Sequence, residues 1–514
     1  MTPDHWLIPE TPYESYDEYL DHTGENAVEK AYQRSPDDVL EEVHRAGLRG
    51  RGGAGFPAGI KWRTLKNHPS TTRFVTCNAA EGEPGTFKDR FLLRRNPYPV
   101  LEGMLIAAHV IGAQALYIGI KASFTRELAR LRRAVVELST AGLIRDVDVH
   151  IVEGPDEYLF GEEKALMEVL EGGEPMPREA HRPPYEVGLF ATPASPNPAL
   201  ANNVETYAHV PSILRHGADS FRKLGTPDTP GTLIFTVSGA VKKPGVYERE
   251  AGITLRELFY DVAGGPLDGR AFKAAMSGVS ARVIPADKFD IAADFASLQL
   301  IGAGLGSAGF ILYDDRTSMP RVAQAVARFL YVESCNQCTA CKHGLRVASD
   351  ALNEIFDPRK ASADDLPRAL FGARSAPQGN RCYLPVQGSV VIPSFADRFK
   401  EEFDEQIANP GAATEPVLIP KFVDFIEETG TFVLDERLPR KRPDWTYDEP
   451  VAEATAPSIP RTRPAPADLD RAPVAVRLSP DLVAALTAEA ERSGQPIDKV
   501  VNEALRTWLK GIER

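Results

Sequence analysis

Four cysteines with regular spacing are the residues whose chemistry is easiest to foresee. Cys335, Cys338 and Cys341 are separated by two residues each, and Cys382 follows much later in the chain. Three thiols in one tight loop cannot be paired sensibly into disulfides, and with a distant fourth they suit a [4Fe–4S] cluster, which needs one thiolate for each iron. The alternatives are a structural zinc site, which more often uses two separate C-x2-C pairs, and unrelated buried thiols. The spacing favours an iron–sulfur cluster and therefore electron transfer.

A glycine-rich loop between Gly50 and Gly59 could hold a phosphate or a flat ring. It contains five glycines in ten residues, which let backbone N–H groups approach a ligand closely, and Arg51 and Lys61 add positive charge. Its G-x-G-x-x-G pattern is typical of dinucleotide-binding turns, but those need a strand directly before the loop, and here the pattern predicts a helix. A flexible surface loop is the alternative. A second glycine-rich run, 302–309, leads into an apolar strand and is interpreted as a turn.

Acidic and amide side chains cluster beside other glycines. The segments 78–90 and 158–163 place glutamates next to glycines at the ends of probable strands, where carboxylates could accept hydrogen bonds from ribose hydroxyls or a nicotinamide amide. Solvated acidic turns are the alternative. The paired amides Asn202 and Asn203 either cap a helix or grip the polar edge of a ligand.

Composition limits what kind of protein can position these residues. The chain has 514 residues, and 43% of them are hydrophobic, which is enough for a large core in about three or four domains. The net charge of −13 disfavours nucleic acid and anionic membranes as partners. The fifth cysteine, Cys77, lies in an apolar run and is interpreted as a buried structural thiol, a pattern that suits a reducing compartment. The first residues do not resemble a secretory signal, and 101–120 is better explained as a buried helix–strand pair than as a membrane span, so we expect a cytoplasmic protein without membrane insertion.

The order of the predicted elements indicates an α/β protein with several parts. An acidic, tyrosine-rich arm covers 1–34, and a capped helix starts at Ser35-Pro36 and ends at Ala46-Gly47. Alternation of strands and helices then predicts an α/β domain over 35–225, and strand–turn–strand–helix predicts a β-grasp module over 226–316. The remaining predicted parts are a mostly helical segment with the cysteines, a proline-rich linker and a short tail unit, at 317–435, 436–472 and 473–514.

Several long motifs in one order resemble a known family. They are G-R-G-G-A-G-F-P, C-N-x-x-E-G-E-P-G-T-F-K-D-R, Y-x-x-G-E-E, N-N-V-E-T and E-S-C-x-x-C-x-x-C, spread over about residues 35 to 430. The family is the NADH-binding flavoprotein subunit of NADH:quinone oxidoreductase (respiratory complex I), shared with the diaphorase subunits of NAD-reducing hydrogenases and NAD-dependent formate dehydrogenases. The resemblance implies a Rossmann-like FMN domain, a β-grasp (ubiquitin-like) domain and a helical bundle that carries one [4Fe–4S] cluster.

The resemblance also implies roles for individual residues. It assigns FMN binding to Gly50, Arg51, Gly52, Lys61, Asn78, Asn202 and Asn203. It assigns NADH contacts to Phe56, Glu83, Tyr158, Glu162 and Glu163, with Glu81 and Gly161 completing the cofactor site. The cluster ligands are Cys335, Cys338, Cys341 and Cys382.

The implied activity is that of an NADH-dependent oxidoreductase. Hydride passes between NAD(H) and FMN and single electrons pass to the cluster, so we expect no catalytic acid or base; Glu83 and Glu163 position NADH. Because the chain has no further cysteine-rich modules, we expect partner subunits with iron–sulfur centres: a thioredoxin-like [2Fe–2S] subunit and a ferredoxin-domain or catalytic subunit.

Two features depart from the family. Ala80 stands where the family usually has Asp, so a contact to the flavin or its ribityl chain is expected to be lost; a non-catalytic relay or structural subunit with a degenerate flavin site is therefore one alternative. The tail 473–514 resembles a ribbon-helix-helix unit, which makes a redox-sensing regulator the other. Its charges are balanced, and the outward strand face offers one basic side chain, Arg477, so homodimerisation or docking of a partner is favoured over DNA binding.

Overall fold

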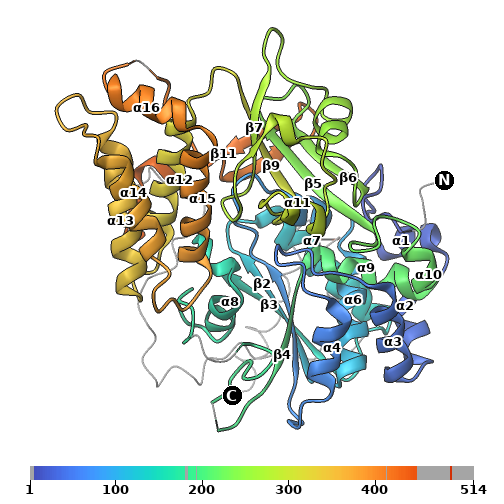
Figure 1. Ribbon diagram of the computed structural model, residues 1–514. Helices are drawn as coiled ribbons and strands as arrows, with labels where there is room; N and C mark the ends of the chain where they lie inside the picture. The colour runs from blue at the N-terminus through green and yellow to red at the C-terminus, as the bar shows by residue number, and fades with distance from the viewer. Residues whose placement is uncertain are drawn as a thin grey trace.

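The computed structural model describes residues 5–179, 183–192, 194–412 and 414–448, together with 487, 488 and 492. In these residues the chain forms a four-stranded sheet, a five-stranded sheet and a two-stranded sheet. A bundle of helices lies to one side of the two larger sheets (Figure 1). The fold is thus mixed α/β, as predicted.

The four-stranded sheet is parallel and has the order β3-β2-β1-β4. The second, third and fourth strands in this order are mostly buried, as expected for a parallel sheet with helices on both faces, and the edge strand β3 is partly exposed. The order reverses beside β1, and in such sheets ligands bind where the strand order reverses, at the carboxyl ends of the strands. The strands are β1 (Phe74–Ala79), β2 (Ala115–Lys121), β3 (Asp148–Gly154) and β4 (Ala199–Asn203).

Helices cover this sheet, and their ends follow local sequence rules. The helix predicted from Ser35 is α3; the Ser35 side chain caps its start, and Gly47 ends it in the left-handed conformation. The predicted helix–strand pair is α6 followed by β2. The helices are α3 (Pro36–Ala46), α4 (Ala58–Lys66), α5 (Lys88–Arg95), α6 (Tyr98–Ile111), α7 (Thr125–Thr140), η1 (Tyr158–Gly161), α8 (Glu163–Leu170), α9 (Val204–His216) and α10 (Ala218–Phe221).

The N-terminal arm is part of the core of this region. It forms α1 (Tyr16–Thr23) and α2 (Ala27–Tyr32), and Val28 is fully buried. Tyr16 and Tyr19 donate hydrogen bonds to the buried carboxylate of Glu102, which also pairs with Arg215 at 2.6 Å. No helical period was predicted for the arm, because two short helices with capping residues leave only a weak pattern.

The five-stranded sheet has the order β6-β5-β9-β7-β8, with β5 parallel to β9 and the other pairs antiparallel. The helix predicted over 254–259 is replaced largely by a π-helical turn, η2. The elements are β5 (Thr232–Gly239), β6 (Gly245–Glu250), η2 (Glu257–Val262), β7 (Phe272–Ser277), β8 (Ile284–Pro285), η3 (Ala286–Lys288), α11 (Phe295–Leu300) and β9 (Gly309–Asp314).

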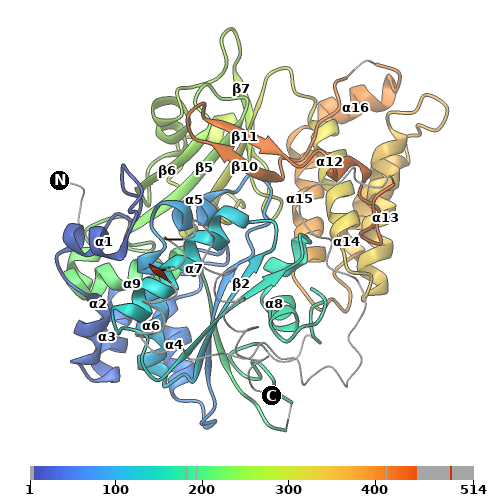
Figure 2. The same cartoon turned by 180° about the vertical axis from the view of Figure 1, so that it is seen from behind.

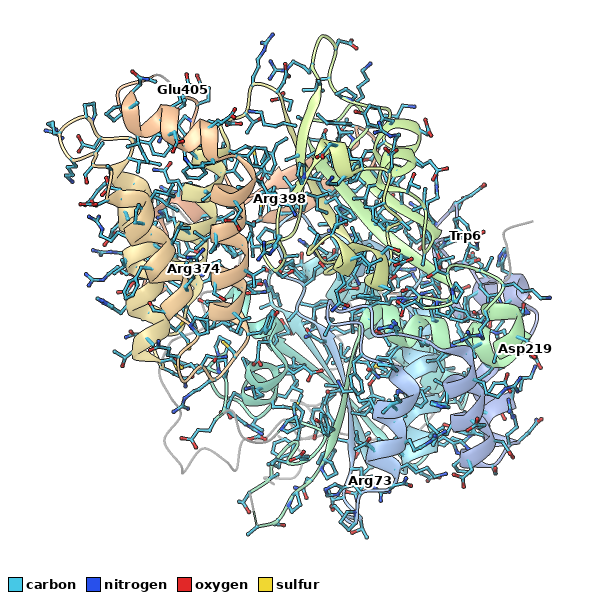
Figure 3. The ribbon with its side chains drawn as sticks, in the orientation of Figure 1. Trp6, Arg73, Asp219, Arg374, Arg398 and Glu405 are labelled. Atoms are coloured by element: carbon cyan, nitrogen blue, oxygen red, sulfur yellow. The ribbon has the colours of Figure 1, made fainter. Side chains whose placement is uncertain are left out.

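The helical bundle follows and contains the cysteines. Gly344 and Gly372 bring two of its helices close together, because a Cβ at Gly344 would lie 2.5 Å from the Gly372 carbonyl oxygen. Charged side chains such as Arg374 and Glu405 lie on the outer side of the bundle (Figure 3). The helices are α12 (Met319–Glu333), α13 (Thr339–Glu354), α14 (Asp365–Ser375), α15 (Leu384–Arg398) and α16 (Lys400–Ala408).

The segment after α16 differs from the prediction. It forms a hairpin of β10 (Phe422–Ile426) and β11 (Thr431–Leu434), then η4 (Leu438–Arg440). The hairpin crosses from the bundle toward the α/β region (Figure 2), where Phe422 and Phe425 pack with Phe87 and Phe91 of that region. It is therefore neither helical nor part of the bundle core, because its aromatic side chains find their buried partners on α5.

Residues 436–448 are not an open linker. Leu438 and Trp445 are buried in the hydrophobic cluster of the helical bundle, and Lys342 donates a hydrogen bond to the Pro443 carbonyl at 2.7 Å. The proline content suggested an extended chain, but apolar anchors fix it to the bundle. The rest of the predicted linker and the tail 473–514 lie outside the described residues, apart from three isolated positions. Within the described chain, every helix is too short or too polar to cross a lipid bilayer.

Candidate cofactor cavity and cluster site

A cavity of about 230 Å³ lies at the carboxyl ends of β1 and β4, where the strand order reverses. The register of this strand pair places Asn78 beside Asn203. Most of the predicted cofactor residues line the cavity: Gly52, Asn78, Glu81, Glu83, Tyr158, Gly161, Glu162 and Asn203. Segments far apart in the sequence thus meet at the sheet edge where α/β folds bind nucleotides.

Asn78 holds two loops at this edge. Its Nδ2 donates to the Gly161 carbonyl at 2.8 Å, and its Oδ1 accepts from the backbone N–H of Ala80 at 3.2 Å. Ala80 also lines the cavity and is fully buried. The amide of Asn78 therefore ties the acidic loop after β1 to the start of the loop before α8.

Asn203 joins a buried group of charges. Its Oδ1 caps α9 by accepting from the Glu205 N–H at 3.0 Å and also accepts from Lys88 at 3.0 Å, while its Nδ2 donates to Asp89 at 2.6 Å. Lys88 pairs with Asp89 at 2.7 Å and with Glu205 at 2.8 Å. Burial raises the pKa of Asp89, Lys88 lowers it in part, and the result is about 6. Asp89 lines the cavity and brings a titratable carboxyl to it.

The glycine loop connects α3 to α4, so a helix precedes it, as predicted. A hydrogen bond of 2.9 Å from the Gly50 N–H to the Phe56 carbonyl closes the loop. Gly52 lines the cavity, whereas the Phe56 ring is 54% exposed. Gly55 has a φ of +63°, and a Cβ there would lie 2.7 Å from the Phe295 ring. Glycine is thus required at this turn both by conformation and by space.

The Arg51 side chain does not reach the cavity. It is 2% exposed, and its Nη2 donates to the carbonyls of Pro230 and Thr232 at 2.7 and 3.1 Å. Burial lowers the pKa of Arg51 to about 10. The positive charge predicted for ligand binding therefore lies inside the protein between the two sheets, and the backbone N–H of Arg51 donates to the Thr206 hydroxyl at 2.8 Å.

Lys61 and Glu163 form an ion pair of 2.5 Å, and Lys61 also donates to the Ala201 carbonyl at 2.6 Å. Neither side chain is among those that line the described cavity. Asn202 is buried and, with its amide oriented to satisfy both partners, accepts from Trp62 Nε1 at 3.2 Å and donates to the Ala201 carbonyl at 3.1 Å. Asn202 thus joins β4 to α4.

Glu81 is engaged inside the acidic loop. Its carboxylate accepts from Arg90 Nε at 2.8 Å and from the Asp89 N–H at 2.9 Å, and both side chains are buried. Arg90 also donates to the Phe422 carbonyl at 2.9 Å. The buried pair fixes the loop and the C-terminal hairpin to each other, with Glu81 presenting one side to the cavity.

Glu83 is the acid best placed to act on a ligand. Its carboxylate accepts from the Tyr158 hydroxyl at 2.6 Å and from the Val279 N–H at 2.7 Å, and Gln387 donates to the Tyr158 hydroxyl at 2.9 Å. Burial raises the pKa of Glu83 above its usual range despite these bonds. Glu83, Tyr158 and Gln387 all line the cavity and come from the α/β region and the bundle.

Glu162 stands at the start of α8. Its Oε2 accepts from the backbone N–H groups of Lys164 and Ala165 at 2.9 Å each, so it is the N-cap of the helix. Burial raises its pKa to about 7, although the two N–H groups lower it in part. A carboxyl that faces the cavity and titrates near neutrality can change the charge that a ligand meets.

The four predicted ligand cysteines surround a smaller hollow. Cys335 lies in the loop after α12, Cys338 is the N-cap of α13, Cys341 lies in the first turn of α13, and Cys382 precedes α15. Asn336 has a φ of +66°, which allows the tight turn between the first two cysteines. No disulfide joins them, and all four are free thiols.

The thiols around this hollow suit a bound metal group. Burial raises the pKa of Cys335, Cys382 and Cys341, the last to about 12, and neighbouring sulfurs add to the effect at each. Buried thiols become thiolates together when a positively charged metal core compensates their charge. Four thiols around one hollow supply the one thiolate for each iron that a [4Fe–4S] cluster needs.

The cavity and the cysteine hollow are neighbours. Leu159 and Leu384 line both of them, and Tyr383 of the cavity directly follows Cys382. The backbone N–H of Tyr158 donates to Glu333 at 3.2 Å, and Glu333 ends α12 two residues before Cys335. A group bound in the cavity is therefore separated from the sulfurs by little more than two side chains.

Several lining residues were not predicted. Asp89 and Thr86 lie in the same acidic motif as Glu83, and this shared motif is the sequence signal that could have identified them as lining residues. Ser307 belongs to the second glycine-rich run, which is a turn as predicted but reaches the cavity from the five-stranded sheet. Tyr383 and Gln387 come from the bundle, and nothing in their local sequence connects them with a ligand.

Family models match three parts of the chain. The Nuo51 FMN-binding domain matches residues 43–212, and the iron–sulfur binding region of NADH-ubiquinone oxidoreductase F matches 321–406. The SLBB domain matches 234–283, within the five-stranded sheet. These ranges contain the cavity-lining loops of the α/β region and the four ligand cysteines.

Similar proteins agree with these models. The second NADH-quinone oxidoreductase F protein of Rhizobium meliloti is 41% identical over 390 residues, which are 74% of this chain and 91% of that protein. The NADP-reducing hydrogenase protein HndC of Solidesulfovibrio fructosivorans is 34% identical over 77% of this chain and 81% of its own length. A crystal structure of NAD+-reducing [NiFe]-hydrogenase in the air-oxidized state aligns with a TM-score of 0.68 at 33% identity, covering 81% of this chain and 68% of that one. The chain belongs to the family of NADH-quinone oxidoreductase F proteins and related hydrogenase subunits, oxidoreductases that bind NADH, FMN and a [4Fe–4S] cluster and transfer electrons from NADH.

Proposed function

We propose that the cavity beside β1 and β4 takes both FMN and the nicotinamide of NADH, and that the adjoining sulfurs hold the cluster that accepts the electrons. The observation that carries this proposal is the pair Leu159 and Leu384, which line both hollows. When bound, FMN supplies a ring that accepts a hydride and passes its electrons on singly. The protein contributes alignment, exclusion of water and fixed charges.

Each predicted residue has a proposed role. In the glycine loop Gly52 lines the cavity, while Gly50 and Arg51 shape the loop through N–H bonds to the Phe56 carbonyl and the Thr206 hydroxyl. Asn78 and Asn203 offer amides beside it, and Lys61 and Asn202 complete the proposed FMN site. Glu83 is assigned as a residue that positions NADH by accepting hydrogen bonds from it. The hydrogen bond from the Tyr158 hydroxyl, which fixes the Glu83 carboxylate, supports this assignment. The other residues proposed for NADH and the rest of the cofactor site are Phe56, Glu81, Gly161, Glu162 and Glu163.

We further propose the finer architecture implied by the resemblance. It comprises a Rossmann-like FMN/NADH domain over 35–225, a β-grasp domain over 226–316 and a cluster bundle from 317, with a ribbon-helix-helix-like tail at 473–514 that dimerises. The mixed five-stranded sheet and the SLBB match support the second of these. Proposed partners are a thioredoxin-like [2Fe–2S] subunit and a ferredoxin-domain or catalytic subunit, and the free thiols support a reducing, cytoplasmic location.

The decisive experiment is an anaerobic titration of the reconstituted full chain with NADH. We expect loss of oxidised flavin absorbance and the appearance of a reduced-cluster EPR signal. Chain that binds FMN and iron yet stays oxidised would refute the proposal and favour a relay subunit with a degenerate flavin site. The Cys382→Ala variant is the matched control: it should show the flavin change without the cluster signal.

A further inference from the structure

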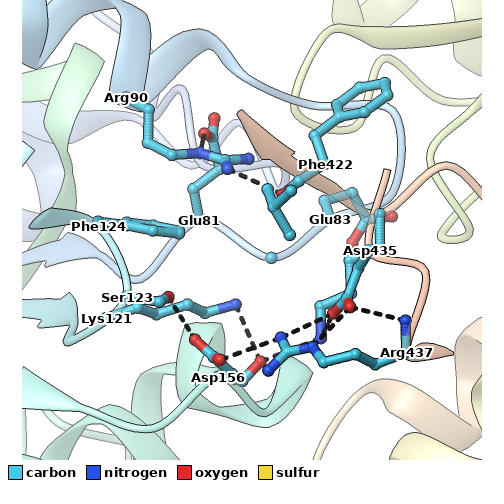
Figure 4. Close-up of a pocket in the computed structure, with 13 residues that line it drawn as sticks. Glu81, Glu83, Arg90, Lys121, Ser123, Phe124, Asp156, Phe422, Asp435 and Arg437 are labelled. Carbon is cyan, nitrogen blue, oxygen red and sulfur yellow. Dashed lines mark hydrogen bonds and ion pairs between the residues drawn. The ribbon is translucent and has the colours of Figure 1, made fainter. Parts of the chain in front are cut away.

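A second cavity lies on the other side of the acidic loop. It has a volume of about 70 Å³ and is formed by the loops that follow β1, β2 and β3, under the C-terminal hairpin (Figure 4). Glu81, Gly82 and Glu83 line both this cavity and the cofactor cavity. The carboxyl edge of the parallel sheet is therefore divided into two cavities. The proposed function places FMN and NADH in the first cavity and assigns no ligand to the second.

Most charges around the second cavity are already paired. Glu81 binds Arg90 at 2.8 Å, and Asp435 binds Arg437 at 2.8 Å. Arg437 also reaches Asp156 at 3.3 Å. These carboxylates therefore have cationic partners, and Nη1 of Arg437 makes no hydrogen bond within the described chain.

Lys121 is the exception. It ends β2, is 2% exposed, and extends into the cavity between Phe124 and Asp156 (Figure 4). Within the described residues its ammonium makes one hydrogen bond, to the Asp156 carbonyl at 3.3 Å, and no ion pair. Gly82 leaves room for it, because a Cβ there would lie 2.9 Å from Lys121 Nζ. Two of its three N–H donors are left without a protein acceptor among those residues.

The surroundings of Lys121 disfavour its charge. Burial, together with the charges of Lys421 and Arg90, lowers its pKa; attraction from Asp156 and Glu333 offsets this in part, and the result is about 7. A buried ammonium with so few acceptors costs free energy unless an anion accompanies it. Glu83 also faces the cavity, but its carboxylate already accepts from Tyr158 and Val279.

We propose that this second cavity is a binding site for a small monovalent oxyanion of carboxylate or bicarbonate size, held by Lys121 and by the free Nη1 of Arg437. The volume of about 70 Å³ admits such an ion and excludes a nucleotide. Lys121 makes no ion pair among the described residues, and the Glu83 carboxylate is held by Tyr158 and Val279, so a ligand with one negative charge suits the cavity better than a phosphate dianion.

The test is calorimetric titration of the cofactor-loaded full chain with sodium nitrate, a planar monoanion that does not titrate near neutrality. Ionic strength is held constant with sodium gluconate, whose anion is too large for the cavity. We expect saturable binding that weakens about tenfold or more in Lys121→Met, because a charge-assisted bond is lost. Arg126→Met, a nearby change at an exposed side chain paired with Asp424, should bind nitrate like the original chain.

Two further measurements decide the remaining outcomes. Lys121→Arg keeps the charge and should keep binding, and a bromide-soaked crystal of the unaltered chain should show anomalous density beside Lys121 Nζ; both remain available if Lys121→Met does not fold. Absence of saturable nitrate binding, equal binding by Lys121→Met, or tighter binding of inorganic phosphate than of nitrate would each overturn the proposal.

Discussion

Cys382 is the ligand on which closure of the cluster site depends. The other three cysteines lie in one loop and one helical turn, whereas Cys382 comes from the segment before α15 and completes the lining of the hollow. We expect Cys382→Ala to lose the [4Fe–4S] EPR signal and most of the bound iron while FMN remains, because one iron would lack its thiolate. Iron analysis together with EPR of the dithionite-reduced protein measures this.

The control for that prediction is the fifth cysteine. Cys77 is fully buried on β1, and burial raises its pKa well above the usual range. Cys77→Ala should leave the iron content unchanged. Loss of iron in Cys77→Ala, or retention of a normal cluster in Cys382→Ala, would contradict the ligand assignment.

Glu83 offers a second prediction at the scale of a residue. Glu83→Gln keeps the shape but removes the charge that would strengthen hydrogen bonds to NADH, so we expect KM for NADH to rise by about tenfold with FMN content unchanged. Steady-state reduction of ferricyanide measures KM. The exposed Glu401→Gln on α16 is the control, and an unchanged KM in Glu83→Gln would show that Glu83 does not position NADH.

For single residues, sequence motifs predicted which residues lie near the cavity but not the direction in which their side chains point. The acidic and amide motifs located the cavity, because their residues follow strands whose ends meet at one edge, whereas the glycine loop follows a helix and contributes Gly52. The inward direction of Arg51 was not predictable, because its partners Pro230 and Thr232 lie far along the chain. For the same reason Gln387, which reaches Tyr158 from α15, carried no local signal.

At the scale of elements, one carboxyl joins the N-terminal arm to β6. Glu248 is 4% exposed and accepts from the N–H groups of Leu7 and Ile8, both at 2.8 Å, and from the Thr232 hydroxyl at 2.6 Å. Burial raises the pKa of Glu248 to about 7, although these bonds lower it in part. With the arm attached, the carboxyl keeps its proton up to about neutrality; a solvated glutamate loses it near pH 4.5.

The sign of the pH dependence follows. Attachment of the arm binds a proton between those two pKa values, so its contribution to stability is full below pH 4.5 and is lost as pH rises through about 7. We expect hydrogen exchange at Leu7 and Ile8, corrected for intrinsic rates, to show weaker protection at about pH 8 than at about pH 5, by at most about 1.4 kcal/mol for each pH unit. Glu248→Gln should remove this dependence. An equal dependence in the variant would assign it to another group.

The elements themselves were predictable where local chemistry decides them. The helix from Ser35 to Gly47 has its capping residue, early acids and terminal glycine in sequence, and the strands around 232–237 and 310–313 are apolar runs next to turns. The hairpin of β10 and β11 was missed inside a region predicted to be helical, because Phe422 and Phe425 are three residues apart and an irregularity in the strand register follows Phe422. Its stability comes from Phe87 and Phe91, which are distant in sequence.

At the scale of the whole molecule, Glu333 is the point where three parts meet. It ends α12 of the bundle, accepts from the Tyr158 N–H of the α/β region at 3.2 Å, and pairs with Lys441 of the C-terminal segment at 2.8 Å. Burial would raise the pKa of Glu333, but Lys441 and Lys421 overcome this and hold it at about 2. The C-terminal segment thus supplies the cations that allow a buried carboxylate between the cofactor cavity and the cluster loop.

Two truncations test this arrangement. Chain 1–448 keeps the hairpin, Lys421 and Lys441, so we expect it to retain FMN, iron and NADH oxidation. Chain 1–418 leaves Glu333 buried without its cations, which costs about 3–5 kcal/mol, and it uncovers Phe87 and Phe91. We expect a lower thermal unfolding midpoint and loss of iron during purification. Lys441→Met, which keeps the full length, should reproduce part of the loss because the uncompensated charge alone is unfavourable. If 1–418 and Lys441→Met both keep iron and match 1–448 in thermal unfolding, the C-terminal segment does not hold the two redox regions together.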